Sequence, residues 1–195
     1  MLKWQILGIN RHIQNKISER NSMNLVIKMP YNKFNVMIIM PKIGISETNL
    51  KKSAFILSTV LSDEMTLYIK TRKFHWNIVG NSFMELHKLF ETQYREFEEI
   101  IDEIAERINK LGSKTIGTMK EFSSYTRLIE YENKYPQQKE MIKELLSDNE
   151  FLITEIRKDI DLISIDNHDA GTADLLTKIL QQHETMAWVL RRYLS

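Results

Sequence analysis

Long stretches of the chain carry apolar residues at mixed three- and four-residue spacing, which is the pattern of amphipathic helices. The first predicted helix runs from about Asn49 to His75 or Trp76. Its apolar positions are Phe55, Leu57, Val60, Leu61, Met65, Tyr68 and Ile69. Residues 77–80 form the turn that follows.

A second helix is predicted to begin at Ser82, because Ser82 and Glu85 have the spacing of a capping box. Gly112 is placed to end this helix, since glycine is favoured just beyond a helix C-terminus. The apolar stripe between these two points includes Leu86, Leu89, Phe90, Phe97, Ile101, Ile104 and Ile108.

Two further helices follow a long connection. Residues 113–135 mix Ser, Thr and Gly with few apolar residues, which predicts a connection holding one short helix. Pro136 suits the first turn of a third helix that ends near Ile165. Residues 166–171 form a turn, and the last helix covers about residues 172–193. These elements predict an all-α fold, a ferritin-like four-helix bundle with the long connection between its second and third helices.

The composition agrees with one helical domain that has no thiol chemistry. The 195 residues are 43% apolar and include only 6 glycines and 3 prolines. The chain has no cysteine, which excludes disulfides, thiolate metal sites and cysteine nucleophiles. No apolar run approaches the ~20 residues that a transmembrane helix needs. We therefore expect no membrane partner and a cytoplasmic location.

Charge is distributed unevenly along the chain. Residues 1–40 carry six Lys and Arg against Glu19, about +5, which leaves residues 41–195 with 21 basic and 25 acidic residues, or −4. We predict that residues 1–40 are an N-terminal extension, either a flexible arm or the result of a misassigned start, and that residues 41–195 form the bundle. Because the bundle is slightly acidic, DNA binding is expected to be weak or absent.

Four residues have the chemistry and the spacing of metal ligands: His75, His87, Asp102 and Glu106. Asp102 and Glu106 are four residues apart on the predicted second helix, so they share one of its faces. The two histidines flank the turn between the first two helices and can lie close together. Mixed imidazole and carboxylate ligands suit iron, and zinc or manganese would also accept them.

One chain cannot bring all four residues to one ion. His87 and Asp102 are fifteen residues apart on one helix, which separates them by ~22 Å. A second subunit related by a two-fold axis would place its carboxylates opposite the histidines and create two identical interface sites. The common site within a single ferritin-like bundle uses Glu-x-x-His on two helices, and the sequence contains no Glu-x-x-His.

Other histidines and tryptophans have simpler interpretations. His12, His168 and His183 are each isolated in the sequence, and we expect packed or surface roles for them. Trp76 and Trp188 are expected in the core or in an interface, as large aromatic side chains usually are.

The sequence resembles the Dps family of mini-ferritins over roughly residues 46–195. The segment from Lys70 to Asn77, Lys-Thr-Arg-Lys-Phe-His-Trp-Asn, resembles the family signature that ends the first helix. The similarity continues through Gly80, Phe83, Leu86, His87, Leu89, Phe90, Gln93, Tyr94, the run Ile101-Asp-Glu-Ile-Ala-Glu-Arg-Ile108, the run Gly171-Thr-Ala-Asp-Leu-Leu176, and Trp188.

The resemblance implies roles for individual residues. His75 and His87 would be the histidine ligands of one subunit, with Asp102 and Glu106 supplied by its partner. Glu91 falls where the family often has an acidic residue for a second, weaker iron position.

Two residues outside the ligand set also match the family. Trp76 would lie beside the site and quench radicals. Asp174 matches an acidic residue that lines a three-fold pore, although a carboxylate there could also stabilise the start of the last helix through its dipole.

The resemblance further implies a homododecameric shell with two-fold and three-fold contacts. Such a shell would bind two irons at each interface site, oxidise Fe(II), usually with hydrogen peroxide, and store ferric mineral inside. One alternative is a DNA-binding nucleoid protector with secondary iron chemistry. A second is a structural bundle whose interface sites hold zinc without turnover.

Overall fold

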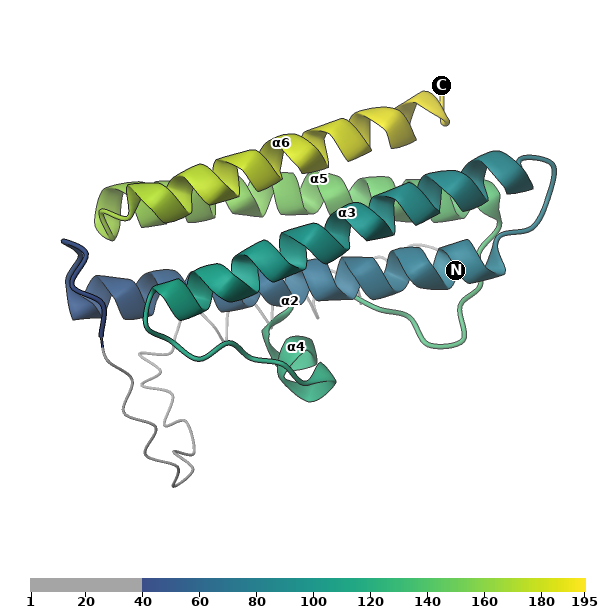
Figure 1. Cartoon of the computed structure of the whole chain (residues 1–195). Helices are drawn as coiled ribbons and strands as arrows, with labels where there is room; N and C mark the ends of the chain where they lie inside the picture. The colour runs from purple at the N-terminus through teal and green to yellow at the C-terminus, as the bar shows by residue number, and fades with distance from the viewer. Residues whose placement is uncertain (1–39) are drawn as a thin grey trace, which may run out of the picture. The chain divides into compact units, whose positions relative to one another are not determined.

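The computed structural model of the chain describes residues 40–195. Residues 1–39 lie outside the description, and with them nearly all of the predicted extension and His12. The helices, in chain order, are α2 (Glu47–Asn77), α3 (Phe83–Lys110), α4 (Met119–Tyr125), α5 (Gln138–Asp161), the π-helix η1 (Leu162–Asp166) and α6 (Ala170–Arg192). Figure 1 shows them with the same labels.

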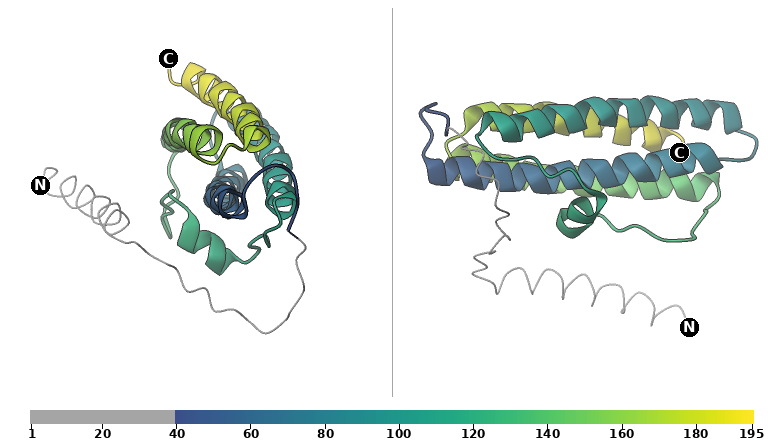
Figure 2. Two further views of the ribbon diagram at one scale, coloured as in Figure 1. Left: turned by 90° about the vertical axis from the view of Figure 1, so that its left-hand side faces the viewer. Right: turned by 60° about the horizontal axis from the view of Figure 1, so that its bottom comes forward.

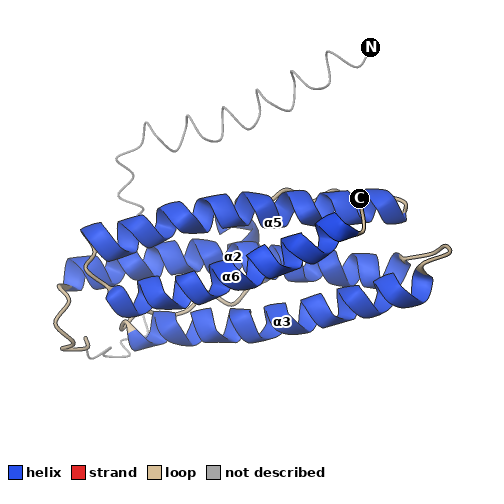
Figure 3. Ribbon diagram, turned by 90° about the horizontal axis from the view of Figure 1, so that it is seen from above, coloured by secondary structure: helices blue, strands red, loops and turns tan. Residues whose placement is uncertain are grey.

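Four long helices form an antiparallel bundle. Helices α2 and α3 are joined by a tight turn and pack side by side, and α5 and α6 form the second pair (Figure 1). The end-on view in Figure 2 shows the four helices around a common axis, with α4 outside the bundle beside α2. Figure 3 shows that the described elements are helices joined by loops. The predicted all-α bundle with a short helix in the connection is confirmed.

The core consists of the apolar stripes of the four helices. Leu57 and Leu61 of α2 and Phe90 and Phe97 of α3 are fully buried, as the spacing predicted. Phe55 was placed on the same stripe, but its side chain is 48% exposed and contacts Tyr125 of α4 edge to face. The connection passes over this part of α2, so Phe55 packs outward against it rather than inward.

The start of α3 differs from the predicted capping box. Ser82 is the N-cap, but its side chain makes no capping hydrogen bond. Its backbone has φ −97° and ψ 30°, outside the extended conformation in which an N-cap hydroxyl can reach the amides of the first turn. The capping box with Glu85 is therefore wrong. A capping box does occur at Thr118 and Glu121 and opens α4.

The predicted end of α3 at Gly112 is confirmed. Gly112 has φ +80°, the left-handed conformation that glycine adopts without strain. The amide of Ser113 donates to the carbonyl of Ile108 and that of Gly112 to the carbonyl of Asn109, the two bonds of a Schellman motif. A Cβ at this position would lie 2.6 Å from Pro41 Cδ, so the site also excludes larger residues by contact.

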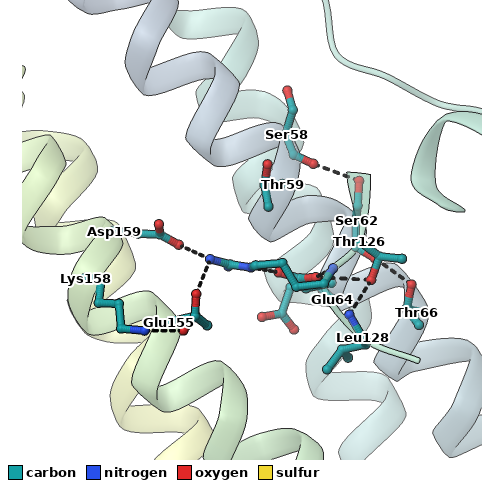
Figure 4. Close-up of polar contacts among 12 residues, drawn as sticks. Ser58, Thr59, Ser62, Glu64, Thr66, Thr126, Leu128, Glu155, Lys158 and Asp159 are labelled. Atoms are coloured by element: carbon teal, nitrogen blue, oxygen red, sulfur yellow. Dashed lines mark hydrogen bonds and ion pairs between the residues drawn. The ribbon is translucent and has the colours of Figure 1, made fainter. Parts of the chain in front are cut away.

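Arg127 attaches the connection to the bundle. Its Nε donates to Oδ2 of the fully buried Asp63 at 2.7 Å, and its side-chain NH1 group donates to Asp159 of α5 at 2.9 Å. Figure 4 shows Thr126, Glu155 and Asp159 around this point. The ion pairs join α2, the connection and α5, and they fix the path of residues 126–128.

The third helix begins later than predicted and ends in a wider turn. Pro136 precedes the N-cap residue, Gln137, and so lies outside the helix. Regular α-helix stops at Asp161, and η1 continues to Asp166 with a bond from the amide of Asn167 to the carbonyl of Leu162. None of the helices within residues 40–195 combines the length and the apolarity needed to cross a membrane.

Candidate metal centre

The two histidines lie on either side of the turn between α2 and α3. His75 is in the last turn of α2, and His87 is in the second turn of α3. Ile78 is buried and anchors the chain where it leaves α2. Gly80 has φ +120°, and a Cβ there would lie 2.9 Å from the side chain of Gln138. The sharp reversal at Gly80 brings the two histidines together.

Reciprocal hydrogen bonds hold the two imidazole rings. Nδ1 of His75 lies 2.8 Å from the carbonyl oxygen of His87, and Nδ1 of His87 lies 3.0 Å from the carbonyl oxygen of His75. The rings stack with centroids 3.7 Å apart. The carbonyl of His75 is available because the last carbonyls of an α-helix have no partner within the helix.

These contacts determine which nitrogen can bind a metal. A carbonyl oxygen only accepts hydrogen bonds, so each Nδ1 must carry the proton and donate it. In a neutral ring Nε2 then keeps its lone pair, the arrangement found when a histidine binds a metal. Within residues 40–195, Nε2 of neither ring makes a hydrogen bond.

Exposed apolar side chains surround this end of the bundle. Trp76, Val79 and Met84 are between 64% and 71% exposed, and Phe83 stacks at a tilt on His87 with ring centroids 5.0 Å apart. Apolar groups gathered beside open ring nitrogens are typical of a surface that contacts another protein.

The carboxylates Asp102 and Glu106 lie far along α3 from the histidines. Both side chains are exposed, and they project from the same helix about one turn apart. Lys110 forms an ion pair with Glu106 at 2.8 Å, and this hydrogen bond lowers the pKa of Glu106. Among the described residues, no group of three or more His, Asp or Glu side chains lies close enough to hold a metal ion.

Glu91 lies one helical turn after His87 on α3. Its carboxylate accepts hydrogen bonds from Lys88 at 3.0 Å and from Arg95 at 2.7 Å. These bonds lower its pKa, with Lys88 contributing most. A metal ion that bound Glu91 would have to compete with both cations.

Asp174 has an exposed side chain in the second turn of α6. The start of α6 is capped by Asp169, whose carboxylate accepts from the amide of Thr172 at 3.1 Å. Asp169 also pairs with Arg107 of α3 at 2.8 Å. Because Asp169 already caps the N-terminus of α6, Asp174 is not needed as its cap.

The two predicted tryptophans and the lone histidine His168 are exposed, whereas the lone histidine His183 is buried. Trp76 and Trp188 are 64% and 53% exposed, so the prediction that they lie in the core is wrong, while an interface role stays a prediction. His168 is exposed, with φ +55° in the turn before α6. His183 is fully buried and packed, one of the two roles expected for it.

The polar cluster that His183 forms inside the bundle with Glu64 and Asn149 was not predicted from the sequence. His183 hydrogen-bonds Glu64 through Nε2 at 2.7 Å and Asn149 through Nδ1 at 2.8 Å. A signal for them exists in the spacing. Glu64 follows the core residue Leu57 by seven positions, and His183 follows Leu176 by seven, so both fall on apolar stripes.

Comparison with known proteins supports a single family. The ferritin-like domain matches residues 56–195. An uncharacterized low temperature-induced protein of Nostoc sp. is 38% identical over 158 residues, which are 80% of this chain and 88% of that protein. DNA protection during starvation protein 2 of Bacillus anthracis is 36% identical over 72% of this chain and 94% of its own length.

A solved structure extends this similarity to the fold. The Dps protein of Vibrio cholerae O1, described as a member of a broad superfamily of ferritin-like diiron-carboxylate proteins, superimposes with a TM-score of 0.75. It shares 27% of its sequence with this chain and covers 83% of this chain and 100% of its own.

Proposed function

Because the chain belongs to the Dps mini-ferritins of the ferritin-like family, we propose that it oxidises Fe(II) at sites shared between two subunits and stores the ferric product inside a shell. Membership in this family implies iron storage and DNA protection. The location of the sites, the use of peroxide and the dodecameric state are the finer parts of the proposal.

One observation carries the shared site. His75 and His87 present two unused Nε2 atoms, while no third His, Asp or Glu among residues 40–195 of the same chain lies close enough to join them. Two nitrogen ligands alone hold iron poorly, so a partner must supply the rest. A two-fold axis that runs α3 antiparallel to its copy would bring the partner's carboxylates to the histidines.

Each ligand would have a definite part in the reaction. The histidines would bind Fe(II) through Nε2 while each Nδ1 keeps its proton and donates it to a backbone carbonyl oxygen, which fixes the ring orientation. Asp102 and Glu106 of the other subunit would offset the positive charge of the ion, after Glu106 leaves Lys110. Glu91 would hold a second iron more weakly, because Lys88 and Arg95 compete for it.

The substrate chemistry is then a two-electron step. Two Fe(II) ions and one hydrogen peroxide, with two protons, give two Fe(III) ions and two waters. This stoichiometry releases no hydroxyl radical, which accounts for a protective role. Asp174 would line a three-fold pore, where a ring of three carboxylates attracts cations.

The first experiment is the anaerobic addition of Fe(II) to the purified protein, followed by substoichiometric peroxide, with ferric absorbance and sedimentation mass recorded together. Rapid oxidation by a particle of dodecameric mass supports the proposal. A monomer or dimer without oxidation contradicts it. Peroxide consumption that survives replacement of both histidines by alanine would favour the alternative of a structural zinc site.

Subunit mixing tests whether the site is shared. His75→Ala/His87→Ala and Asp102→Asn/Glu106→Gln variants are each expected to be inactive. After dissociation and random reassembly half of the dimers are mixed, and each mixed dimer has one intact site of two, so about a quarter of the wild-type activity should return. No recovery, with reassembly verified by mass, would place all the ligands in one chain and refute a shared site.

DNA binding is proposed to be weak or absent in the bundle. Residues 41–195 carry a net charge of −4, and nonspecific DNA affinity comes mainly from cationic contacts to phosphates. A gel shift at low salt with the chain that starts at Met40 should be negative. A clear shift would instead favour the nucleoid-protector alternative.

A further inference from the structure

A chain of aromatic rings leads away from the candidate metal centre along the α2–α3 interface. The ring of Tyr94 meets His75 edge to face, with centroids 5.2 Å apart. Tyr68 meets Tyr94 in the same way, with centroids 6.2 Å apart. The three rings therefore connect His75 to a tyrosine two helical turns earlier on α2.

Tyr68 differs from its neighbours in having a base at its hydroxyl. Its O–H donates to Oε1 of Glu98 at 2.7 Å, and the guanidinium of Arg72 donates to the same phenol oxygen. Burial, together with the bond to Glu98, raises the pKa of Tyr68. The phenol therefore keeps its proton at neutral pH and has an acceptor ready to take it.

We propose that Tyr68 is a redox-active tyrosine that supplies an electron through Tyr94 to an oxidant formed at His75 and His87 and passes its proton to Glu98. This inference rests on the proposed function and concerns a side reaction of the same site. The side reaction arises when a site holds one Fe(II) in place of two.

The chemistry balances with hydrogen peroxide and Fe(II) as the only reactants. One Fe(II) reduces H2O2 to hydroxide and a hydroxyl radical and becomes Fe(III). The radical takes the electron of Tyr68 and becomes hydroxide, while the Tyr68 proton moves to Glu98 and leaves a neutral phenoxyl radical. A second Fe(II) then reduces the phenoxyl radical, which recovers its proton from Glu98.

The proton acceptor is the reason to choose Tyr68. Removing an electron from a phenol makes its O–H strongly acidic, and without a base the positive charge would remain in a partly buried place at high cost. Within residues 40–195 the hydroxyl of Tyr94 has no carboxylate partner, and the Trp76 indole makes no hydrogen bond. Tyr94 and Trp76 therefore lack the acceptor that Tyr68 has.

Arg72 keeps the relay in place. Its guanidinium lies over the rings of Tyr68, Tyr94 and Trp76, with distances to the ring centroids of 5.4, 4.8 and 5.3 Å. The same guanidinium donates a hydrogen bond to the phenol oxygen of Tyr68. Arg72 is thus a positioning residue.

The test is freeze-quench electron paramagnetic resonance on the full-length protein. Samples receive less than one Fe(II) per site and then hydrogen peroxide, and ring-deuterated tyrosine identifies a tyrosyl signal. Ferric absorbance is recorded on the same samples. The variants are Tyr68→Phe, Glu98→Gln and, as a matched control, Tyr125→Phe, whose position in α4 against Phe55 is twenty residues of α2, or ~30 Å, from His75.

We expect a tyrosyl signal in the wild type that is lost in Tyr68→Phe and largely lost in Glu98→Gln, which keeps the shape of the side chain but cannot take the proton. Tyr125→Phe should keep the signal. A signal that persists in Tyr68→Phe, or disappears in Tyr125→Phe as well, overturns the relay. Normal ferric formation without any tyrosyl signal overturns the relay alone, whereas no ferric formation overturns the proposed function too.

Discussion

His183 and the pair His75 and His87 belong to one bundle but lie in opposite surroundings. His183 is fully buried and uses both ring nitrogens, one for Glu64 and one for Asn149. His75 and His87 each use only Nδ1 and leave Nε2 unbonded. The number of hydrogen bonds that a histidine makes within its own chain, more than its burial, therefore indicates whether its ring is available to a ligand.

The same contrast separates the carboxylates of the two regions. Asp63 is enclosed by Arg127, its backbone amide and Thr126, and none of its surface is exposed. Asp102 and Glu106 project into solvent, and the partner of Glu106 within residues 40–195 is the exposed side chain of Lys110. Polar groups that are buried and fully hydrogen-bonded within the chain stabilise the bundle. Exposed polar groups with unused donors or acceptors are the candidates for function.

The largest expected effect is on stability, from His183→Ala. The change removes the one hydrogen-bond partner that the Glu64 side chain has within residues 40–195, where its Oε2 atom is buried without a partner. Removing one partner of a buried acid–base pair costs about 3–5 kcal/mol, because the other partner is left without a compensating group. We expect the melting temperature at fixed protomer concentration to fall by roughly 10 °C. His168→Asn, a change at an exposed left-handed position, is the control and should shift it little.

Glu64→Gln tests whether the loss of stability in His183→Ala comes from the lost hydrogen bond. Glutamine keeps a hydrogen bond to His183 and removes the carboxylate, so its cost should be clearly smaller than that of His183→Ala. Equal melting temperatures for His183→Ala and the wild type would mean that the interior cluster contributes nothing, and the contrast between closed and open groups would fail.

The second prediction concerns the pH dependence of Asp63. Burial raises the pKa of Asp63 to about 6, despite the attraction of Arg127. Because this pKa exceeds the ordinary aspartate value of 3.8, the stabilising contribution is fully present below about pH 4 and is lost as the pH rises through 6. The shift corresponds to about 3 kcal/mol.

Urea unfolding of the wild type and of Asp63→Asn between pH 4.5 and 7.5 measures this contribution. The difference in unfolding free energy, wild type minus variant, should decrease as the pH rises. A difference that increases with pH would show that the ion pair with Arg127 outweighs burial and that the folded-state pKa of Asp63 is depressed.

The sequence predicted the helices well because their burial is periodic. Apolar spacing indicated the long helices, the composition of residues 113–135 predicted the connection with its short helix, and the preference for glycine beyond a helix C-terminus predicted the end of α3 at Gly112. It failed at Ser82, where the preceding turn sets a backbone conformation that the hydroxyl cannot overcome. It also failed at Phe55, because spacing does not reveal that the connection covers the outer side of α2.

The candidate site was predictable in part. Positions on either side of one turn predicted that His75 and His87 could meet, and their rings do stack. Their protonation pattern depends on reciprocal carbonyl contacts that no spacing reveals. Glu64 was missed because a carboxylate on an apolar stripe has meaning only when its partner, 119 residues away in α6, is known. The ligand roles themselves stay predictions.

The third prediction concerns His75 and His87, the histidines whose Nε2 atoms are unbonded. His75→Ala/His87→Ala should lower the rate of Fe(II) oxidation by more than about 100-fold, since loss of ligands exceeds the effect usually seen for their supporting groups. The unfolding free energy should fall by no more than about 2 kcal/mol, the value of two ordinary hydrogen bonds. Stopped-flow ferric absorbance and urea unfolding measure the two quantities.

The pattern is opposite to that of His183→Ala, which should weaken folding while the assembled fraction still oxidises iron. A double variant that lost stability as severely as His183→Ala would show that the histidine pair is primarily structural. That outcome would remove the distinction between the two regions.

The smallest expected effect is that of Glu91→Gln. Glu91 is 21% exposed and paired with Lys88 and Arg95, so it is intermediate between the buried, fully bonded groups and the exposed, unbonded ones. If it holds the second, weaker iron, its loss should leave the first Fe(II) bound and lower the oxidation rate about tenfold. Anaerobic Fe(II) titration should then show one ion per site in the variant and two in the wild type.

Glu85→Gln, an exposed change on the same helix, is the matched control. An unchanged stoichiometry in Glu91→Gln would mean that its two cations keep Glu91 closed, and the second iron would need another ligand.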